Sequence, residues 1–426
     1  MTTGADPADA LRRRLLAALP EPARLALEAI IAAAAGPIYA AGGVPRDLLL
    51  GRAFADIDLV VEADDAAALL RAAVPGGRVT AHARFGTAST STPGTRIDIA
   101  GARSETYARP GALPRTRSGS IEDDLRRRDF SINALALRLN RAPALLDPCG
   151  GMRDLRERRI RVLHERSFAD DPTRIFRALR YAARLDFALD AETARLLRES
   201  VIHIPALSGD RVRRELELIL TEETAGRAME ACQATGVLRM THPALRWDTR
   251  CSAALASGGG ATVVRGCALL AAGASAADAE AIVARLRLTR QEAAAVRAMP
   301  ALASLSPALR RPAVKPSGVA MLLDRFPAAA VAAFSGVARD GVARGLALRY
   351  LGEWRQVKPA LSGRDLQELG VPAGPQIKRG LQLIRAARLD GWASDRNDER
   401  ALAARFARSI RDSASAAPRP EHPLGD

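Results

Sequence analysis

The chain has 426 residues, 48% of them hydrophobic and 26% charged, which describes a soluble globular protein of about two to four domains. Its formal net charge of +15 favours a polyanionic partner, although the arginine-rich composition of a GC-rich genome would give the same charge. The longest apolar run is too interrupted to span a membrane, and the N-terminus does not resemble a secretory signal. The four cysteines are scattered, which excludes a zinc site or a disulfide set and indicates a cytoplasmic protein.

Strand-like segments are expected only in the first third of the chain, where short β-branched or alternating runs are bounded by Gly, Pro or Asp. They cover residues 37–41, 57–61, 78–80, 87–92 and 96–99, with helices between them at 46–50 and 66–73. After about residue 150, long Ala/Leu/Arg segments recur with a period of about 3.6 residues. These predicted helices cover residues 172–185, 191–200, 210–220, 225–235, 276–286 and 290–299. The sequence therefore predicts an α+β fold with a small mixed head and a helical remainder.

Gly42 and Gly43 lie between the first predicted strand and the helix that follows it. Glycine lets the backbone approach a phosphate closely, and a helix N-terminus supplies free N–H groups and a positive dipole end. Arg46 adds a planar guanidinium that fits phosphate oxygens. The pattern predicts a phosphate-binding turn.

Asp56 and Asp58 occupy the next predicted strand, where residues two apart face the same side. Two metal ions held there ~3.5–4 Å apart would activate an attacking hydroxyl and stabilise a leaving pyrophosphate. A site made only of carboxylate oxygens suits Mg²⁺. Two aspartates alone are more often solvated surface residues, but the glycine turn one helix upstream favours a catalytic metal-binding pair.

Asp98 lies in the predicted strand 96–99. It is either a third carboxylate, acting as metal ligand or as base for a primer 3′-hydroxyl, or a surface side chain of an edge strand. Residues 103–120 follow, rich in Gly, Pro, Arg and Ser. They are expected to form a long loop that is functional or mobile.

Three consecutive arginines precede Asp129, and they repel one another unless an anionic ligand or the acidic residues 122–124 compensate them. A nucleoside triphosphate would do so. We assign Arg128 to phosphate and place Asp129 and Asn133 near the ribose hydroxyls. The alternative is a solvated, charged helix start.

Asp171 and Pro172 mark the start of a helix. Residues 171, 174, 177 and 180 follow at i,i+3 spacing, so Asp171 offers an acceptor and Arg174, Arg177 and Arg180 offer donors to one ligand. Cytosine and adenine both carry an exocyclic amine beside a ring acceptor, whereas uracil and guanine present a carbonyl that Asp would repel. The row predicts base selection without a template. Alternatively, Asp171 only caps the helix and the arginines are solvated.

Four ordered segments resemble the class II tRNA nucleotidyltransferase and bacterial poly(A) polymerase family: GGVPRDLLLGRAFADIDLV, EDDLRRRDFSINALAL, DPCGGMRDL and DDPTRIFRALRYAARLDF. The resemblance covers about residues 38–187. It implies a polymerase-β-like nucleotidyltransferase head at residues 20–150, a helical neck with the base-reading helix at 151–220, a helical body at 221–310 and a tRNA-binding helical tail at 311–412. Residues 413–426 are rich in Ala and Pro and are expected to be disordered.

The resemblance also implies roles for individual residues. It implies that Gly43 and Arg46 bind the incoming nucleotide, that Asp56 and Asp58 bind Mg²⁺, and that Arg128, Asp171, Arg174, Arg177 and Arg180 complete the nucleotide site. Two residues depart from the family pattern: Pro45 stands where Val is usual, and Asp170 stands where Glu is commoner. The shorter reach of Asp170 affects only hydrogen bonding in the neck. In the tail, the helix start at Lys378-Arg379 suits RNA phosphate.

The resemblance implies an enzyme that uses ATP and CTP to add C and A residues to the tRNA 3′ end with release of pyrophosphate. Residues 103–120, where CCA-adding and CC-adding members are thought to differ, are not shortened, which favours a CCA-adding or an A-adding enzyme. Poly(A) polymerase is the runner-up. A non-catalytic RNA-binding protein would have lost Asp56, Asp58 or Arg174, and all three are present. The oligomeric state is not determined by the sequence.

Overall fold

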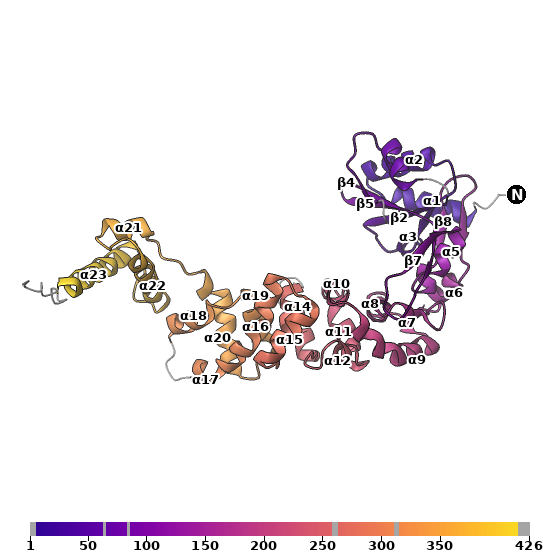
Figure 1. The fold of residues 1–426 in the computed structure, drawn as a ribbon. Coiled ribbons are helices and arrows are strands. Elements are labelled where there is room, and N and C mark those ends of the chain that lie inside the picture. The colour runs from indigo at the N-terminus through magenta and orange to yellow at the C-terminus, as the bar shows by residue number, and fades with distance from the viewer. Residues whose placement is uncertain (1–5, 63–64, 83–85, 258–262, 311–314, 416–426) are drawn as a thin grey trace, which may run out of the picture. The chain divides into compact units, whose positions relative to one another are not determined.

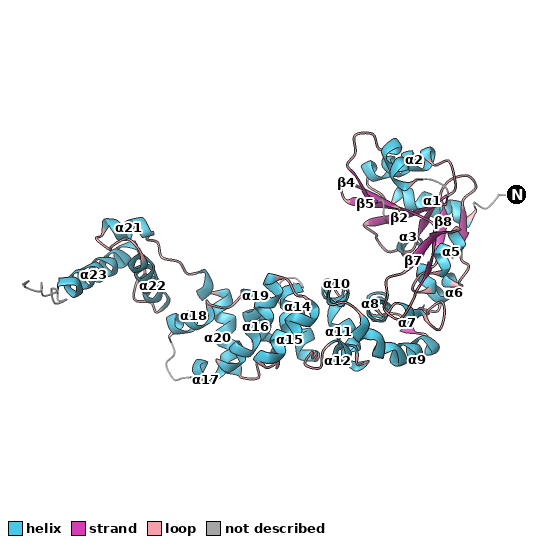
Figure 2. Ribbon diagram, in the orientation of Figure 1, coloured by secondary structure: helices cyan, strands magenta, loops and turns pink. Residues whose placement is uncertain are grey.

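The computed structural model describes residues 6–62, 65–82, 86–257, 263–310 and 315–415, and the chain forms two compact units, Met1–Pro243 and Ala244–Asp426. Figure 1 labels the elements of both units. Among the described residues, strands occur only in the first unit (Figure 2). The chain therefore has the α+β head and the helical remainder that the sequence predicts.

The first unit is built around one mixed sheet with the strand order β3-β4-β5-β2-β1-β8-β9. Within it β2 and β5 run parallel, and the other neighbouring strands are antiparallel. The strands are β1 (Ile38–Ala41), β2 (Asp56–Val61), β3 (Val79–His82), β4 (Thr87–Thr92), β5 (Thr95–Gly101), β8 (Ala136–Arg138) and β9 (Ala144–Leu146). The five predicted strands are confirmed. β8 and β9 escaped prediction because they are short and contain no β-branched residue.

Helices flank this sheet and then continue through the neck. They are α1 (Pro7–Ala17), α2 (Glu21–Ala33), α3 (Gly43–Leu49), α4 (Ala66–Ala73), α5 (Ile121–Arg126), α6 (Gly151–Arg156), α7 (Ser167–Asp170), α8 (Thr173–Leu185), α9 (Ala191–Ser200), α10 (Gly209–Leu220), α11 (Ala225–Ala234) and α12 (Val237–Thr241). Short 3₁₀ turns lie at Ser131–Asn133 and Val201–Ala206, and a small parallel pair joins β10 (Arg159–Ile160) to β11 (Ala188–Leu189). The helices predicted in this part of the chain are confirmed.

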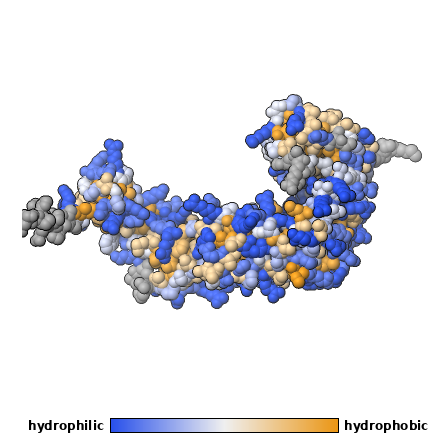
Figure 3. Space-filling model, in the orientation of Figure 1, coloured by the Kyte–Doolittle hydropathy of each residue, from blue (hydrophilic) through white to orange (hydrophobic). Residues whose placement is uncertain are grey.

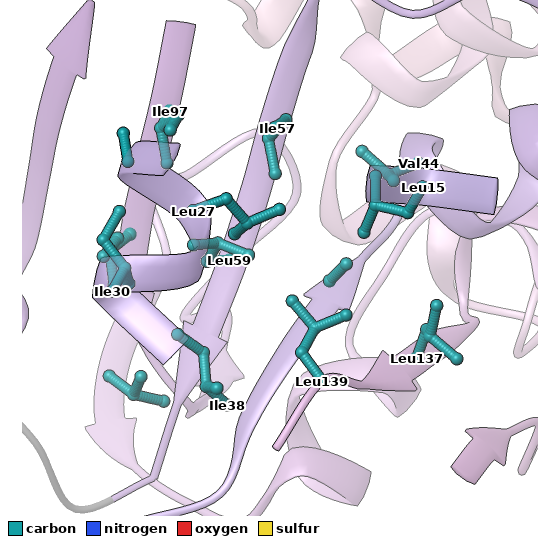
Figure 4. Close-up of a cluster of buried hydrophobic side chains, with 14 of the residues drawn as sticks. Leu15, Leu27, Ile30, Ile38, Val44, Ile57, Leu59, Ile97, Leu137 and Leu139 are labelled. Carbon is teal, nitrogen blue, oxygen red and sulfur yellow. The ribbon is translucent and has the colours of Figure 1, made fainter. Parts of the chain in front are cut away.

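The main hydrophobic core of the head packs α1 and α2 against one face of the sheet (Figure 4). Ile57 and Leu59 of β2 and Leu15 of α1 are members of this core. Since alternate side chains of a strand face opposite sides, burial of Ile57 and Leu59 turns Asp56 and Asp58 to the other face. Because Leu15 is fully buried here, the head begins before the predicted boundary at residue 20.

Residues 103–120 contain a β-hairpin where the sequence predicts a loop. β6 (Arg103–Thr106) and β7 (Arg115–Ser118) pair antiparallel as a separate two-stranded sheet. The connection between them is tied to the neck, because Arg211 Nη1 donates a hydrogen bond to the Gly111 carbonyl at 2.9 Å. Both strands are polar on each face, so no apolar alternation announces them in the sequence.

The second unit is helical among its described residues. Its helices are α13 (Thr249–Ala256), α14 (Val263–Leu270), α15 (Ala276–Leu286), α16 (Arg290–Ser304), α17 (Ser306–Leu309), α18 (Pro316–Leu323), α19 (Ala328–Val337), α20 (Gly341–Gly352), α21 (Gly363–Glu368), α22 (Pro375–Leu389) and α23 (Arg396–Ser415), with a 3₁₀ turn at Trp354–Gln356. A separate core joins α21, α22 and α23 through Leu366, Ile384 and Ala403. Because α23 extends to Ser415, the predicted disorder is wrong for 413–415, and 416–426 lie outside the described residues.

Hydrophilic residues cover much of the visible face of the molecule (Figure 3). Among the described residues, no single helix is long and apolar enough to cross a membrane. The helices α18 and α19 meet the length and composition criterion only as a pair, and they are bent by 112° at the break between them.

We predict that Leu15→Ala lowers the free energy of unfolding of the first unit by about 2–5 kcal/mol, because it leaves a cavity in the core that holds β2. Hydrogen exchange of the β2 amides in the full chain measures this locally. Arg13→Ala on the same helix is the control: its side chain is 58% exposed, so the change is within about 0.5 kcal/mol. Equal exchange in the two variants would show that α1 is not part of the head.

Candidate active site

Three carboxylates lie close together on the sheet face opposite the α1–α2 core. Asp56 and Asp58 are exposed on β2, and Asp98 lies directly opposite Asp58 in the parallel pairing with β5. Desolvation raises the pKa of Asp58, Arg128 opposes the rise, and the neighbouring Asp98 and Asp56 carboxylates add to it. The tertiary structure thus brings together all three carboxylates singled out from the sequence.

The chemistry of this carboxylate set fits a hard divalent cation. All the side-chain ligands are oxygens, as Mg²⁺ prefers, and a cation would relieve the repulsion from Asp98 and Asp56 that adds to the desolvation raising the pKa of Asp58. Within the described parts of the chain, no group of three or more His, Cys, Asp or Glu side chains forms a metal site by itself. A Mg²⁺ ion would therefore complete its coordination with water and substrate oxygens, as this ion commonly does.

A polar cavity of about 410 Å³ adjoins the carboxylates, and we call it the nucleotide cavity. Nine residues singled out from the sequence line it: Gly42, Gly43, Asp58, Arg128, Asp129, Asn133, Asp171, Arg174 and Arg177. They come from β2, the α3 turn, the segment after α5, and the start of α8. Four predicted residues do not line it: Arg46, Asp56, Asp98 and Arg180.

The glycine turn is shaped by its contact with Arg128. Gly42 has φ +74°, in the region that disfavours side chains, and a Cβ built on it would lie 2.5 Å from Arg128 Nη1. The other end of that guanidinium is held by Asp124, which accepts from Nε at 3.2 Å and Nη2 at 2.9 Å. Arg128 is thereby fixed between the turn and Asp58, a position suited to a phosphate.

Asp124 is the buried anion that allows the arginines to sit together. It is fully buried, and its Oδ1 accepts from Arg127 Nη2 at 2.5 Å while its Oδ2 serves Arg128. Arg127 also donates to Glu105 at 2.8 Å. Of the acidic residues 122–124, Asp124 is therefore the one that compensates the charges of Arg127 and Arg128. Nη1 of Arg128 lies beside the turn and has no hydrogen bond to any residue that the structure describes.

Arg46, predicted to contact phosphate, is only 3% exposed, and its guanidinium is already engaged. It donates to Asp47 at 2.9 and 2.8 Å and to Asn133 Oδ1 at 2.6 Å, and it stacks over the Tyr181 ring at 5.2 Å. Arg46 is a buried brace that positions Asn133 in the cavity wall.

Asp129, Asn133 and Arg177 form one hydrogen-bonded group. Asp129 Oδ2 accepts from Arg177 Nε at 2.8 Å, and its Oδ1 accepts from Asn133 Nδ2 at 2.9 Å. Burial alone would raise the pKa of Asp129, but Arg177, Asn133 and Arg174 outweigh it and lower the pKa to about 2. Asp129 is therefore ionised, and any ribose contact at Asp129 or Asn133 is shared with these bonds.

Asp171 stabilises the start of α8 with one of its carboxylate oxygens. Its Oδ1 accepts from the Thr173 amide at 3.0 Å, the Thr173 hydroxyl at 2.7 Å and Arg211 Nη2 at 2.7 Å. Its Oδ2 has no hydrogen-bond partner among the described residues. Arg174 is fixed by bonds to Ser167 Oγ and the Arg127 carbonyl, both at 2.7 Å. A free acceptor and a fixed guanidinium thus lie in one cavity wall.

Arg180, predicted to offer donors to the nucleotide, does not line the cavity, and it is buried against Glu222, with 3.3 Å between Nη1 and Oε1, and against the Tyr181 ring. Arg180 lies six residues after Arg174 in α8, so its side chain points about a third of a turn away around the helix axis. Of the arginines at i,i+3 spacing, Arg174 and Arg177 therefore face the nucleotide cavity and Arg180 does not.

The cavity region also contains residues that were not singled out from the sequence. Glu105, Tyr107, Tyr181 and Glu215 line the cavity, and Arg211 bonds to Asp171. Glu105 accepts from Tyr107 and Arg127, so it fixes the hairpin wall. Glu215 is buried, which raises its pKa against the opposing effects of Arg177 and Arg180. The sequence signal that could have identified two of them is the i,i+4 spacing of the charged residues Arg211 and Glu215 on the amphipathic helix α10.

Comparison with known proteins gives consistent matches. Residues 38–161 match the family described as "Poly A polymerase head domain", and residues 186–247 match "Probable RNA and SrmB- binding site of polymerase A". The chain is 35% identical over 399 residues to an A-adding tRNA nucleotidyltransferase of Geobacter sulfurreducens, which covers 88% of this chain. The chain spans 45% of the length of that relative.

Two solved structures are similar over nearly the whole chain. A CCA-adding enzyme in apo form II has a TM-score of 0.75 and 29% identity, with 94% of this chain and 98% of that chain covered. A Thermotoga maritima CCA-adding enzyme complexed with tRNA has a TM-score of 0.71 and 29% identity, with 93% and 98% covered.

We predict that Gly42→Ala weakens ATP binding by about tenfold or more, because the new Cβ displaces Arg128 from the turn and removes a charge-assisted contact. Isothermal titration calorimetry measures the affinity. Gly51→Ala is the matched control, since Gly51 has φ +65° but a Cβ at this position would meet no atom within 4 Å. This variant carries a positive-φ backbone penalty without the clash. Equal ATP affinity in both variants would argue against a phosphate site at the turn.

Proposed function

Because the chain belongs to the tRNA nucleotidyltransferase and poly(A) polymerase family, we propose that it adds C and A residues to the 3′ end of tRNA without a template. CTP and ATP are the substrates and pyrophosphate is the second product. The observation that carries this proposal is the convergence of Asp58, the glycine turn and the Asp171–Arg174 pair on one cavity, with Asp98 paired opposite Asp58 on the neighbouring strand. A phosphate-transfer centre and a base reader are thereby adjacent.

In the proposed reaction, the RNA 3′-oxygen forms a bond to the α-phosphorus, and the bond from that phosphorus to the pyrophosphate oxygen breaks. Asp56 and Asp58 would hold Mg²⁺, which when bound supplies charge stabilisation to the attacking and leaving oxygens. Gly42, Gly43 and Arg128 hold the triphosphate. Asp98, opposite Asp58, accepts the proton of the 3′-hydroxyl.

Base selection follows from the unpaired Asp171 Oδ2 and the fixed Arg174 guanidinium. The carboxylate accepts from the exocyclic amine of cytosine or adenine, and Arg174 donates to the adjacent ring nitrogen. A uracil or guanine carbonyl would face the carboxylate and leave buried polar groups unpaired. The same pair of side chains therefore serves both CTP and ATP.

The tRNA is the proposed macromolecular partner, and a basic surface on the second unit supports this. Lys378 and Arg379 are exposed in the first turns of α22, and the whole chain carries a net charge of +15. A cytoplasmic location is part of the proposal, and the four free cysteines agree with a reducing compartment.

An enzyme that adds only the terminal A is the second candidate. It is favoured by the Geobacter sulfurreducens A-adding relative, whose similarity extends over 88% of this chain. The cavity is compatible with both candidate functions, since Asp171 and Arg174 can pair with either cytosine or adenine.

The test offers tRNAs that end before C74, after C74 and after C75, with CTP and ATP separately and Mg²⁺ present, and sizes the products. We expect two C additions followed by one A. Asp56→Ala is expected to abolish transfer, because it removes a metal ligand from the reacting centre.

Each other product pattern has a defined meaning in this assay. Addition of A alone, and only after C75, would replace the main proposal with the A-adding candidate. Unlimited A tails would indicate poly(A) synthesis. No product with any nucleotide mixture would overturn the proposal and favour an RNA-binding protein without catalysis.

We predict that Asp171→Asn reduces discrimination against UTP and GTP by about 10- to 100-fold, because an amide can donate to the carbonyl that the carboxylate repels. Steady-state kcat/KM with each of the four nucleotides measures the effect. The control is Asp170→Asn, one residue earlier, which pairs with Arg166 at 3.2 Å and does not line the nucleotide cavity. Unchanged selectivity in Asp171→Asn would place base selection elsewhere.

A further inference from the structure

A second cavity, of about 290 Å³, is lined by two of the catalytic carboxylates, Asp58 and Asp98. It shares Asp58, Arg127 and Arg128 with the nucleotide cavity, and it adds Arg96, Asp98 and Arg103 together with backbone and small side chains of β4 and β5. Because Asp58 borders both cavities and Asp98 borders only this one, we call it the acceptor cavity. The two cavities meet at the reacting centre.

The nucleotide-transfer reaction requires a place for the attacking hydroxyl, and the acceptor cavity provides one. The attacking and leaving oxygens lie roughly in line through the phosphorus, so they approach it from opposite sides. With the triphosphate in the nucleotide cavity beside Gly42 and Arg128, the leaving pyrophosphate lies on that side of Asp58. The attacking hydroxyl then comes from the side of Asp98, which is the acceptor cavity.

Two arginines of the acceptor cavity have donors to spare. Arg96 Nε pairs with Asp98 at 3.0 Å, and Arg103 Nε pairs with Glu105 at 3.2 Å. Neither arginine has a hydrogen bond from its terminal nitrogens to another described residue. By contrast, all three nitrogens of Arg127 are bonded to Asp124 or Glu105, and the remaining Nη1 of Arg128 lies beside Gly42 at the nucleotide cavity. Arg96 and Arg103 are therefore the cavity's available anion ligands.

The pair between Arg96 and Asp98 is easily exchanged. The two side chains are 54% and 36% exposed, and an ion pair this open contributes little free energy. A phosphodiester offers the same guanidinium a stronger, two-pronged contact. When Arg96 turns to a phosphate, the Asp98 carboxylate is left free for the 3′-hydroxyl.

We propose that the acceptor cavity binds the 3′-terminal nucleotide of the RNA and that Arg96 and Arg103 bind the phosphodiester preceding it. This inference rests on the proposed function and assigns the acceptor strand to named positioning residues. A third cavity, of about 460 Å³, contains His164 and Arg166. It does not suit this role, because none of the three catalytic carboxylates lines it.

The test uses tRNA acceptors whose last internucleotide linkage is either an ordinary phosphodiester or a neutral methylphosphonate. With the unaltered enzyme, we expect the neutral linkage to lower kcat/KM for the RNA by about tenfold, mainly through KM, as for loss of one charge-assisted contact. This comparison changes no residue, so it does not depend on the folding of a variant.

The variants Arg96→Ala and Arg103→Ala then assign the contact. Each is expected to lower kcat/KM about tenfold with the ordinary linkage. Each should lose little more with the neutral linkage, because the contact is already gone. The KM for the nucleotide should stay within about twofold of the unaltered enzyme, since neither residue lines the nucleotide cavity.

Arg166→Ala is the matched control. Arg166 is a 72% exposed arginine paired with a nearby aspartate, as Arg96 is, but it lines the third cavity. It should keep the full sensitivity to the neutral linkage. A linkage effect lost in Arg166→Ala but retained in the other two variants would overturn the inference, as would equal rates on both RNAs.

The two levels of the proposal fail differently. If the unaltered enzyme transfers nucleotides but ignores the linkage charge, the acceptor cavity is assigned wrongly and the proposed function stands. If it transfers nothing to any tRNA, the proposed function fails and the inference fails with it.

Discussion

The site depends on one constraint: the two-residue alternation of β2. Ile57 and Leu59 are buried in the core against α1 and α2, and this burial turns Asp56 and Asp58 to the opposite face. A shift of one residue in register would exchange the aliphatic and acidic sets, at the free-energy cost of burying two carboxylates. The parallel pairing with β5 then places Asp98 opposite Asp58. Hydrophobic burial on one face thus positions the acidic chemistry on the other.

Buried acidic residues organise the arginines on the rest of the site. Asp124 holds Arg127 and Arg128, and Asp129 holds Arg177. For Arg128 and Arg177 the carboxylate bonds to Nε and Nη2, whereas all three nitrogens of Arg127 are bonded to Asp124 or Glu105. This arrangement keeps several cations close together without a ligand and fixes their orientation, so less side-chain entropy is lost when an anion binds. The nucleotide cavity and the acceptor cavity share two of these arginines, which links the two proposed substrates electrostatically.

Several sequence-based expectations failed for identifiable reasons. The hairpin β6–β7 is polar on both faces and therefore carries no strand period, although it supplies Glu105 to the cavity wall. Arg46 has the residue type of a phosphate ligand, but its neighbour Asp47 and the distant Asn133 occupy its donors. Arg180 belongs to the i,i+3 row, yet between Arg174 and Arg180 the row rotates around α8 by about a third of a turn, and Arg180 does not line the cavity.

Local sequence patterns were sufficient to predict several features. These are the strands β1 to β5, the helices of the neck, the glycine turn, the pair Asp56 and Asp58, and the start of α8. Those features follow from periodicities of two and about 3.6 residues and from backbone preferences, which act over a few residues. Only the tertiary structure decided which arginines face a cavity and which are consumed as braces, because those partners lie far apart in sequence. Arg46 with Asn133, Arg174 with the Arg127 carbonyl, and Asp171 with Arg211 are separated by 87, 47 and 40 positions. A charged side chain's role depends on which opposite charge the fold brings within reach, and no local period encodes that.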